Sequence, residues 1–337
     1  MKRIAINGFG RIGRAFFRLA FGSGDIEVVG LNRTKLEPEV SAYFLKYDSV
    51  YGRYSREVLP REEGIEVDGV LVPLFAEREP ANLPWKDLDV DLVVETTGIF
   101  LAHDGKKGAS QHIEAGAKKV LLSAPPKGDG AEKIPQIVYG VNHDLYDAGK
   151  HSVVSAASCT TNSLVPVAHV IEEEFGIEHA FLTTVHAYTG GQKTVDSAAS
   201  KLTRGRAAAV NIVPTTTGAA KATTKVIPSL AGRMDGMALR VPVPTGSVSD
   251  FTVELKRDVE ATDVNDAFKR YAEGKLSGIL GVSADPIVST DVIGDRRASV
   301  VDLSSTRVVD KRLLKVLAFY DNEWGYTEQL LRVAKLL

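Results

Sequence analysis

The chain has a single cysteine, Cys159, among its 337 residues. One cysteine cannot form an internal disulfide, and it excludes a metal site built from several cysteines. The chain also lacks an excess of charge of either sign, because 41 basic residues are balanced by 43 acidic residues and no run of more than three like charges occurs. Nucleic-acid-binding proteins usually carry a basic patch or stripe, so the linear sequence gives no reason to expect a nucleic-acid partner.

Long hydrophobic runs are absent as well. The first residues, MKRIAINGFG, pass from a short apolar run into a glycine-rich loop too early for a signal peptide. No stretch approaches the ~18 consecutive apolar residues of a membrane-spanning helix, so we expect a cytoplasmic protein with no membrane partner. Hydrophobic residues make up 44% and charged residues 25% of the chain, which is typical of a globular protein. Its length is sufficient for two domains.

Short apolar runs alternate with amphipathic helical stretches in the first half of the chain. Buried strands are expected at residues 3–6, 27–32, 92–96 and 119–123. Helices are expected at residues 14–21 and in the stretch that leads through residues 112–117. Strands that alternate with helices predict an α/β fold with a Rossmann-type, doubly wound parallel sheet.

The pattern changes after about residue 160. A long amphipathic helix is expected at residues 163–175, β-rich runs at 180–187, 238–243 and 251–255, and a closing helix at 323–337. We therefore expect residues 1–157, joined by the closing helix, to form a nucleotide-binding domain. Residues 158–322 are expected to form an α+β catalytic domain with a large mixed or antiparallel sheet.

A glycine-rich loop follows the first predicted strand and opens the first predicted helix. Its residues 8–13, GFGRIG, fit the pattern G-x-G-x-x-G. Gly8 permits a tight turn, Gly10 lets the backbone approach a pyrophosphate, and Gly13 allows the helix to pack closely on the strand. The free N–H groups at the helix start then face the phosphates. A plain glycine-rich turn is the alternative, but the strand and helix on either side favour dinucleotide binding.

The end of the second predicted strand bears on the choice of cofactor. A carboxylate at this point accepts hydrogen bonds from the ribose 2′-hydroxyl of NAD. Here the strand ends LNRTK, and no carboxylate occurs until Glu37. The guanidinium of Arg33 suits a 2′-phosphate by its charge and its forked donors, although Arg33 could also be an ordinary solvated loop residue. We expect NADP to be preferred, with NAD as the other possible cofactor.

Cys159 lies in the run SCTTN, just before the long helix. A helix start stabilises a thiolate. A lone cysteine is more often a small buried residue, but its polar neighbours argue against apolar surroundings. Among seven histidines, His186 is distinctive because it ends the apolar run LTTVH and opens a polar loop. Catalytic groups gather at such strand ends. The histidines have no metal-binding spacing, so no metal is expected.

Six motifs along the chain carry a family resemblance. They read NGFGRIGR, SAASCTTNS, TVHAYTGGQKTVD, PTTTGAAKA, GMALRVP and YDNEWGY, and they span residues 6–326. In this order they closely resemble phosphorylating glyceraldehyde-3-phosphate dehydrogenase of the bacterial type. The resemblance implies reversible oxidation of D-glyceraldehyde 3-phosphate to 1,3-bisphosphoglycerate with reduction of NAD(P), in glycolysis or gluconeogenesis. It also implies a homotetramer.

The resemblance further implies roles for individual residues. Cys159 matches the nucleophile that forms a thiohemiacetal and then a thioester, and His186 matches the base that activates it. The positions implied to hold inorganic phosphate are Ser158, Thr160, Arg204, Thr217 and Gly218, those for the substrate's C3 phosphate are Thr189 and Arg240, and those for the cofactor are Arg11, Ile12, Arg78, Ser123, Asn322 and Tyr326.

The chain departs from the family pattern at several positions. Ala156 replaces the asparagine of SNASCTTN, and Gly191 replaces the aspartate of TNDQ. Ser197 and Ala198 replace a Leu-Pro pair that, in the family, reaches the adenosine ribose of a neighbouring subunit's cofactor. These smaller residues leave room for a 2′-phosphate, so they favour NADP in the same way as Arg33.

Two other functions are compatible with parts of this pattern. The first is an erythrose-4-phosphate dehydrogenase of the same superfamily, which forms no acyl phosphate. The second is a non-catalytic nucleotide-binding or redox-sensing protein with Cys159 as a reactive thiol. The runs TTTGAAKA and HAYTGG fit the phosphorylating enzyme better than either.

Overall fold

The structure is a computed structural model that describes residues 1–35 and 37–337. The chain divides into two compact units. The first consists of Met1–Ile137, Asn142–Ala157 and Leu330–Leu337, and the second of Val138–Val141 and Ser158–Gln329. The last helix, α7 (Trp324–Leu336), therefore contributes residues to both units.

The first unit is built on an eight-stranded sheet. Neighbouring strands are parallel from β10 to β7, and the remaining two pairs, at one edge, are antiparallel. The central strands are continuous apolar runs, which is typical of parallel strands covered on both faces. The strand order is β10 (Val153–Ser155), β9 (Lys119–Leu122), β8 (Leu92–Glu95), β1 (Lys2–Asn7), β2 (Ile26–Asn32), β7 (Val70–Phe75), β6 (Gly64–Val67) and β5 (Val58–Arg61).

Helix α1 (Arg11–Ala20) follows β1 directly. Gly8 has a left-handed φ of +96°, and a Cβ on Gly13 would lie 2.1 Å from the carbonyl oxygen of Gly8. Both glycines are therefore required for the tight strand-to-helix turn. The other elements of this unit are α2 (Pro38–Lys46), α3 (Ser110–Glu114), the hairpin β3 (Tyr47–Asp48) and β4 (Gly52–Arg53), and the 3-10 turns η1 (Pro80–Asn82), η2 (Ala131–Lys133) and η3 (His143–Leu145).

Most of the predicted elements of this unit form close to their expected positions. The helix expected to lead through residues 112–117 is shorter, because α3 ends at Glu114. Gly116 has a left-handed φ of +103°, a conformation that ends a helix. The alternation of strands and helices confirms the predicted doubly wound sheet.

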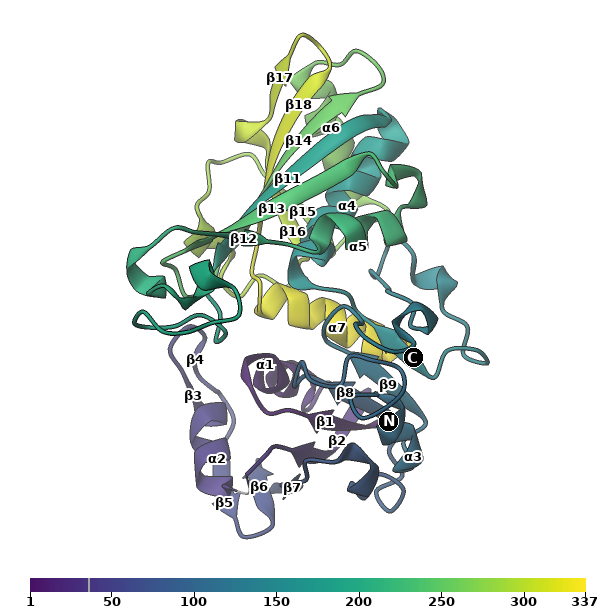
Figure 1. Ribbon diagram of the computed structural model, residues 1–337, viewed down its shortest axis with the longest axis vertical. Coiled ribbons are helices and arrows are strands. Elements are labelled where there is room, and N and C mark those ends of the chain that lie inside the picture. The colour runs from purple at the N-terminus through teal and green to yellow at the C-terminus, as the bar shows by residue number, and fades with distance from the viewer. Residues whose placement is uncertain (36) are drawn as a thin grey trace. The chain divides into compact units, whose positions relative to one another are not determined.

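The second unit contains a mixed eight-stranded sheet, which confirms the prediction of a large mixed sheet. Only β11–β13 and β15–β16 are parallel pairs. Helices α4 (Cys159–Glu174), α5 (Ala219–Val226) and α6 (Ala261–Glu273) pack against it, and Figure 1 shows them behind the long strands. The strand order is β12 (Val213–Thr216), β13 (Met234–Val241), β11 (Ile177–Ala187), β14 (Ser247–Leu255), β18 (Leu313–Tyr320), β16 (Ser299–Asp302) and β15 (Leu280–Ser283), with β17 (Arg307–Val309) on β18.

Helix α4 begins four positions earlier than the predicted start at residue 163. The polar residues after Cys159 indicate a loop, but Ser158 caps the helix: its Oγ accepts a hydrogen bond from the amide of Thr161 at 3.2 Å. Cys159 is thus the first helical residue rather than a residue before the helix. The connections of this unit include the 3-10 turns η4 (Leu202–Gly205), η5 (Ala208–Val210), η6 (Pro228–Leu230), η7 (Ser289–Val292) and η8 (Leu303–Ser305).

Over residues 1–35 and 37–337, no helix is both long and apolar enough to cross a bilayer.

Candidate active site

Cys159 and His186 lie against each other in the second unit. The thiol projects from the first turn of α4, and the imidazole stands near the end of β11. The distance from Sγ of Cys159 to Nε2 of His186 is 3.4 Å. His186 is only 4% exposed, whereas Cys159 keeps part of its surface accessible. This contact unites a thiol with a group that can take its proton.

Burial shifts the pKa values of the two groups in opposite directions. Burial raises the pKa of the Cys159 thiol, although the charge of Arg240 and a hydrogen bond from Thr160 act in the opposite direction. Burial and then the charge of Arg240 lower the pKa of His186 to about 3, against a hydrogen bond to Ala187 that raises it. Burial thus opposes the thiolate that the helix start, Arg240 and Thr160 favour.

Arg240 reaches the far side of the His186 ring. Strands β11 and β13 are parallel, and their register places His186 beside Arg240. Nη1 of Arg240 lies 2.7 Å from Nδ1 of His186 and 2.8 Å from the carbonyl oxygen of Ala187. Within the described ranges, the buried Nε of Arg240 has no hydrogen-bond partner. The guanidinium thus has donor capacity left over beside the thiol.

A buried tyrosine that was not predicted from the sequence supports this pair. The hydroxyl of Tyr320, at the end of β18, lies 3.0 Å from Oγ1 of Thr160 and 2.9 Å from Oγ1 of Thr184. Its ring meets the ring of His186 edge to face, with centroids 6.1 Å apart. Tyr320 opens the run YDNEWGY, but nothing in that run indicates a contact with residues on α4 and β11.

Other predicted phosphate-binding residues occupy nearby loops and helix starts. The charge of Arg204 lowers the pKa of His186, and its Nε donates to Oγ1 of Thr215 at 2.9 Å. Thr217 accepts a hydrogen bond from the amide of Ala219, and Gly218 is the N-cap of α5. Ser158 serves as the cap of α4 and Thr189 is exposed after β11. Among the described residues, Thr160, Arg204 and Arg240 act on the Cys159–His186 pair. Thr189, Thr217 and Gly218 lie on accessible segments.

Asn322 is held by three donors from consecutive residues at the start of β14. Its Oδ1 accepts from the amide of Gly246 at 3.1 Å and from the hydroxyls of Ser247 at 2.9 Å and Thr245 at 3.3 Å. These donors fix the orientation of the amide, because only its oxygen can accept from them. Tyr326, also predicted as a cofactor contact, is buried on α7, and burial raises its pKa well above the ordinary value.

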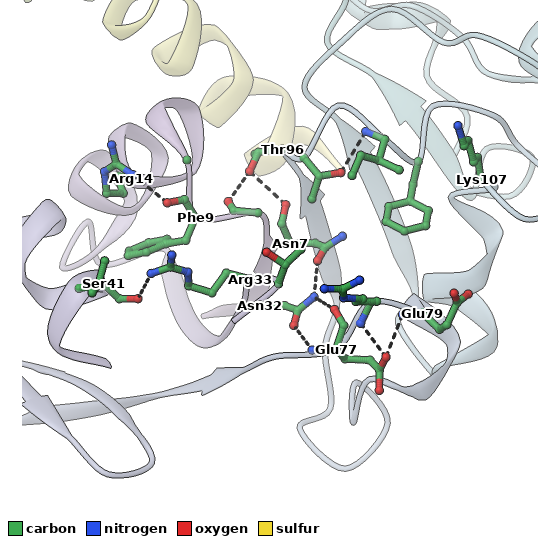
Figure 2. A pocket seen from close by; sticks show the side chains of 18 of the residues that line it. Asn7, Phe9, Arg14, Asn32, Arg33, Ser41, Glu77, Glu79, Thr96 and Lys107 are labelled. Carbon is green, nitrogen blue, oxygen red and sulfur yellow. Dashed lines mark hydrogen bonds between the residues drawn. The ribbon is translucent and has the colours of Figure 1, made fainter. Parts of the chain in front are cut away.

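The first unit has a cavity at the ends of β1, β2 and β8. Its volume is about 780 Å³. The predicted cofactor residues Gly8, Gly10, Arg33 and Arg78 all line it. Figure 2 shows Arg33 among the side chains of the wall. This is the edge at which doubly wound sheets bind their ligands, because the strand order reverses there. Cations outnumber anions on its wall, with Arg14, Arg33, Arg78, Lys106 and Lys107 against Glu77 and Glu79.

Arg33 points along the wall of this cavity toward α2. Its Nη1 donates to Oγ of Ser41 at 3.0 Å, as Figure 2 shows, and its Nη2 lies 3.4 Å from a carboxylate oxygen of Glu37. The side chain is about a quarter exposed. Arg33 is therefore held at the cavity edge by one hydroxyl and one weakly paired carboxylate, and it is not an unattached loop residue.

A buried polar network under the cavity was also missed in the sequence. Oε1 of Glu95 accepts from the amide of Thr97, and its Oε2 accepts from Nδ2 of Asn7. Oδ1 of Asn7 accepts from Asn32 at 2.7 Å, and Asn32 holds the backbone of Glu77 with both ends of its amide. The network ties the ends of β1, β2 and β8 together. Polar residues at the ends of apolar strands were its only signal in the sequence.

Several predicted cofactor contacts lie outside the lining of this cavity. Arg11 pairs with Asp48, and Ile12 and Gly13 belong to the first turn of α1. The amide of Ser123 donates to the carbonyl of Glu95 at 2.9 Å.

The residues at which the chain differs from the family pattern lie in different environments. Ala156 is fully buried before the cap of α4, whereas Gly191, Ser197 and Ala198 are all exposed on a loop of the second unit. The described residues contain no group of three or more His, Cys, Asp or Glu side chains arranged to hold a metal ion.

Family models match both parts of the chain. The model described as glyceraldehyde 3-phosphate dehydrogenase, NAD binding domain, matches residues 2–103, and the model described as its C-terminal domain matches residues 158–322.

Curated proteins match over nearly the whole length. Glyceraldehyde-3-phosphate dehydrogenase of Haloarcula vallismortis is 52% identical, over 99% of this chain and 98% of the relative. Glyceraldehyde-3-phosphate dehydrogenase 2 of Bacillus subtilis is 50% identical, over 96% and 93%. Glyceraldehyde-3-phosphate dehydrogenase of Geobacillus stearothermophilus is 47% identical, over 98% of this chain and 97% of the relative.

Proposed function

Because this chain belongs to the glyceraldehyde-3-phosphate dehydrogenase family, we propose that it catalyses the reversible, phosphorylating oxidation of D-glyceraldehyde 3-phosphate to 1,3-bisphosphoglycerate. It is a nicotinamide-dependent dehydrogenase. The observation that carries the proposal is the 3.4 Å contact between Sγ of Cys159 and Nε2 of His186 at a helix start. This pair supplies a nucleophile and a base for aldehyde chemistry.

The proposed reaction begins at the thiol. Cys159 attacks the aldehyde carbon while His186 takes the thiol proton and passes it to the carbonyl oxygen, so the product is a neutral thiohemiacetal on Sγ and His186 is again free to act as a base. His186 then accepts the hydroxyl proton as the carbon is oxidised to a thioester. The nicotinamide, when bound, accepts the hydride of this step. Inorganic phosphate attacks the thioester carbon, the C–S bond breaks, and the acyl phosphate leaves Cys159 free.

Two phosphate groups must be held near one thiol, which requires cationic and hydroxyl donors. Arg240 and Arg204 are the cations that act on His186, and Arg240 has an unpartnered Nε. We assign the substrate's C3 phosphate to Thr189 and Arg240. We assign inorganic phosphate to the remaining predicted donors, Ser158, Thr160, Arg204, Thr217 and Gly218.

The cavity of the first unit fits a nicotinamide dinucleotide. Nothing lies within 4 Å of the position that a Cβ on Gly10 would take, so a ligand can approach the backbone there. Cationic side chains along the wall suit the pyrophosphate. We assign residues 1–157, with the helix 323–337, as the cofactor-binding domain and residues 158–322 as the catalytic domain. Asn322, the last residue of the catalytic domain, and Tyr326, on the closing helix, are assigned to the nicotinamide.

NADP is the preferred cofactor in this proposal. Arg33 lines the cavity at the position where NAD-linked members of the family carry an aspartate. Its hydrogen bond to Ser41 holds the guanidinium at the cavity wall, where a 2′-phosphate would bind. Ser197 and Ala198 leave space for a 2′-phosphate where a neighbouring subunit would contact the cofactor, which is consistent with a homotetramer. We further propose that the enzyme acts in the cytoplasm.

The variant Arg33→Asp tests the cofactor assignment. A lost charged hydrogen bond costs about 1.5–3 kcal/mol, so kcat/KM with NADP should fall by at least ~10-fold, while NAD use falls less or rises. Arg53→Asp is the control, since Arg53 is exposed and does not line the cavity. A wild-type enzyme that prefers NAD by about tenfold or more would refute the assignment to NADP.

Phosphate dependence tests the reaction itself. Cofactor reduction with glyceraldehyde 3-phosphate should continue only when inorganic phosphate is present. Turnover of erythrose 4-phosphate without any need for phosphate would favour the alternative dehydrogenase. A protein that reduces neither cofactor with either aldehyde would favour a non-catalytic role for Cys159.

A further inference from the structure

A second cavity adjoins the cofactor cavity in the first unit. Its volume is about 560 Å³, which lies within the range of small-molecule binding sites. Residues 98–107, which follow β8, and residues 127–129, which follow β9, contribute its walls. We call it the lysine cavity, because Lys106, Lys107 and Lys127 line it.

Backbone hydrogen bonds hold the two walls of the lysine cavity together. The amide of Lys127 donates to the carbonyl oxygen of Leu101 at 2.9 Å, and the amide of His103 donates to the carbonyl oxygen of Asp129 at 2.9 Å. Strands β8 and β9 are parallel neighbours, so the segments that follow them meet at one edge of the sheet. Open α/β sheets bind their ligands at this edge. The cavity is therefore preformed and lies where a ligand is expected.

The three lysines have no counter-charge of their own. Across residues 1–35 and 37–337, Lys106, Lys107 and Lys127 form no ion pair, and their side chains make no hydrogen bond. All three residues are exposed, so their ammonium groups are free to turn to a ligand. An anion in the cavity would supply the partner that they lack.

Two carboxylates on the wall oppose an anion only in part. Asp104 is already paired, since one of its oxygens lies 2.9 Å from Nζ of Lys133 and the other lies 2.7 Å from Nδ1 of His103. Asp129 has no ion pair among the residues that the structure describes. Three ammonium groups against one uncompensated carboxylate favour an anion with two or more charges.

The lysine cavity and the cofactor cavity share part of their walls. Lys106 and Lys107 line both cavities, and Figure 2 shows Lys107 beside the cofactor cavity. Lys127 lines the lysine cavity but not the cofactor cavity, whereas Arg33 and Arg78 line only the cofactor cavity of the two. An anion that pairs with Lys106 and Lys107 in one cavity therefore takes positive charge away from the other.

We propose that the lysine cavity binds a small polyphosphate anion, and that this anion weakens binding of the cofactor next to it. Lysine ammonium groups bind phosphate as point charges, so a chain of phosphate groups can meet all three of them without a fixed geometry. The anion and the pyrophosphate of the dinucleotide then compete for the charge of Lys106 and Lys107. Binding of the anion stands on the cavity alone, whereas its effect on the cofactor rests on the proposed function.

The first experiment locates the anion by chemical protection. The wild-type enzyme without cofactor is treated with a low concentration of acetic anhydride, with and without tripolyphosphate, at constant ionic strength. Mass analysis of the peptides then gives the rate of acetylation at each lysine. We expect tripolyphosphate to slow acetylation of Lys127 by about fivefold, the upper end for an exposed ion pair.

Lys86 is the internal control, because it is exposed and lines neither cavity. Its acetylation should be the same with and without tripolyphosphate. An unprotected Lys127, or equal protection of Lys127 and Lys86, would overturn the proposal. Citrate carries fewer charges and should protect Lys127 less at the same concentration, so equal or stronger protection by citrate would overturn the assignment to a polyphosphate.

The second experiment measures the effect on the cofactor. In a binding titration, tripolyphosphate should raise the Kd of NADP by about fivefold, the lower end of the usual range for coupled sites. In Lys127→Gln, the concentration of tripolyphosphate that gives half of this effect should rise by about fivefold, while the Kd of NADP without the anion stays that of the wild type. Lys86→Gln is the matched control and should respond as the wild type does.

An unchanged half-effective concentration in Lys127→Gln would show that tripolyphosphate acts inside the cofactor cavity, and it would overturn the proposal. Coupling between two sites is reciprocal. Saturating NADP should therefore raise the concentration of tripolyphosphate needed to protect Lys127 by the same factor. Protection that is indifferent to NADP would overturn the coupling.

Steady-state oxidation of glyceraldehyde 3-phosphate by the wild type separates this inference from the proposed function. If the enzyme turns over but Lys127 is not protected, only the polyphosphate site is wrong. If Lys127 is protected but no aldehyde is oxidised with either cofactor, the proposed function is wrong, and the polyphosphate site remains.

Discussion

Removal of the Tyr320 hydroxyl should destabilise the second unit measurably. That hydroxyl bonds to Thr160 at 3.0 Å and to Thr184 at 2.9 Å, and the two threonines are only 5% and 1% exposed. A buried polar group that loses its partner costs about 1–3 kcal/mol. Without the tyrosine hydroxyl, Oγ1 of Thr160 still has a contact with Sγ of Cys159 at 4.0 Å. In the described part of the chain, Oγ1 of Thr184 has no side-chain partner other than Tyr320. We therefore expect Tyr320→Phe to lower the free energy of unfolding by about 2 kcal/mol.

Urea unfolding at a fixed protein concentration measures this change, since association would otherwise shift the midpoint. Thr184→Val in the Tyr320→Phe background is the decisive comparison. With the tyrosine hydroxyl already gone, this second replacement removes a polar group that has lost its partner, so it should cost far less than Thr184→Val alone. A loss below about 0.5 kcal/mol for Tyr320→Phe, or costs that simply add in the double variant, would refute the reasoning.

Three further predictions concern other parts of the molecule. The pKa of His186 is lowered to about 3 in the folded protein, whereas an unperturbed histidine has a pKa of about 6.5. At a pH below about 6.5, the unfolded chain therefore binds a proton at His186 more readily than the folded protein does. As the pH falls from ~6.5 to ~3, this group should lower the free energy of unfolding by up to about 1.4 kcal/mol per pH unit. Urea unfolding at several pH values should show a smaller slope of this free energy against pH for His186→Gln than for the wild type. An equal slope would contradict the prediction. Ser158→Ala removes the cap of α4 and should cost about 1 kcal/mol in urea unfolding, with Ser158→Thr as the tolerated control. Glu95→Gln replaces an acceptor by an amide donor that faces Nδ2 of Asn7 or the amide of Thr97. We expect it to lower the free energy of unfolding by about 2–3 kcal/mol and to weaken cofactor binding in a titration. Stability and affinity equal to the wild type would show that the network does not shape the cavity.

The sheets could be predicted because their signals are local. The apolar runs of β1 and β8 and the glycines between β1 and α1 depend only on neighbouring residues. Element ends were less predictable. The cap at Ser158 converts a polar segment into the first turn of α4, and Gly116 ends α3 early. These effects depend on single side chains and single φ angles, which hydrophobic periodicity does not register.

The site was predictable only in part. Cys159 and His186 could be singled out by their places at a helix start and a strand end. The contact of His186 with Arg240 depends on the parallel register of β11 and β13, 54 residues apart. The position of Tyr320 depends on packing between β18, α4 and β11. Such contacts form across strands, so no spacing within the chain reveals them.

The central claim is that Cys159 carries the acyl group between oxidation and phosphate attack. Rapid mixing of the enzyme with NADP and glyceraldehyde 3-phosphate, followed by mass analysis of the peptide that contains Cys159, tests it directly. Without inorganic phosphate, we predict a single burst of cofactor reduction and an acyl group on Cys159. Added phosphate should remove that group and restore continuous turnover. Continuous cofactor reduction without phosphate, with Cys159 unmodified throughout, would contradict the account.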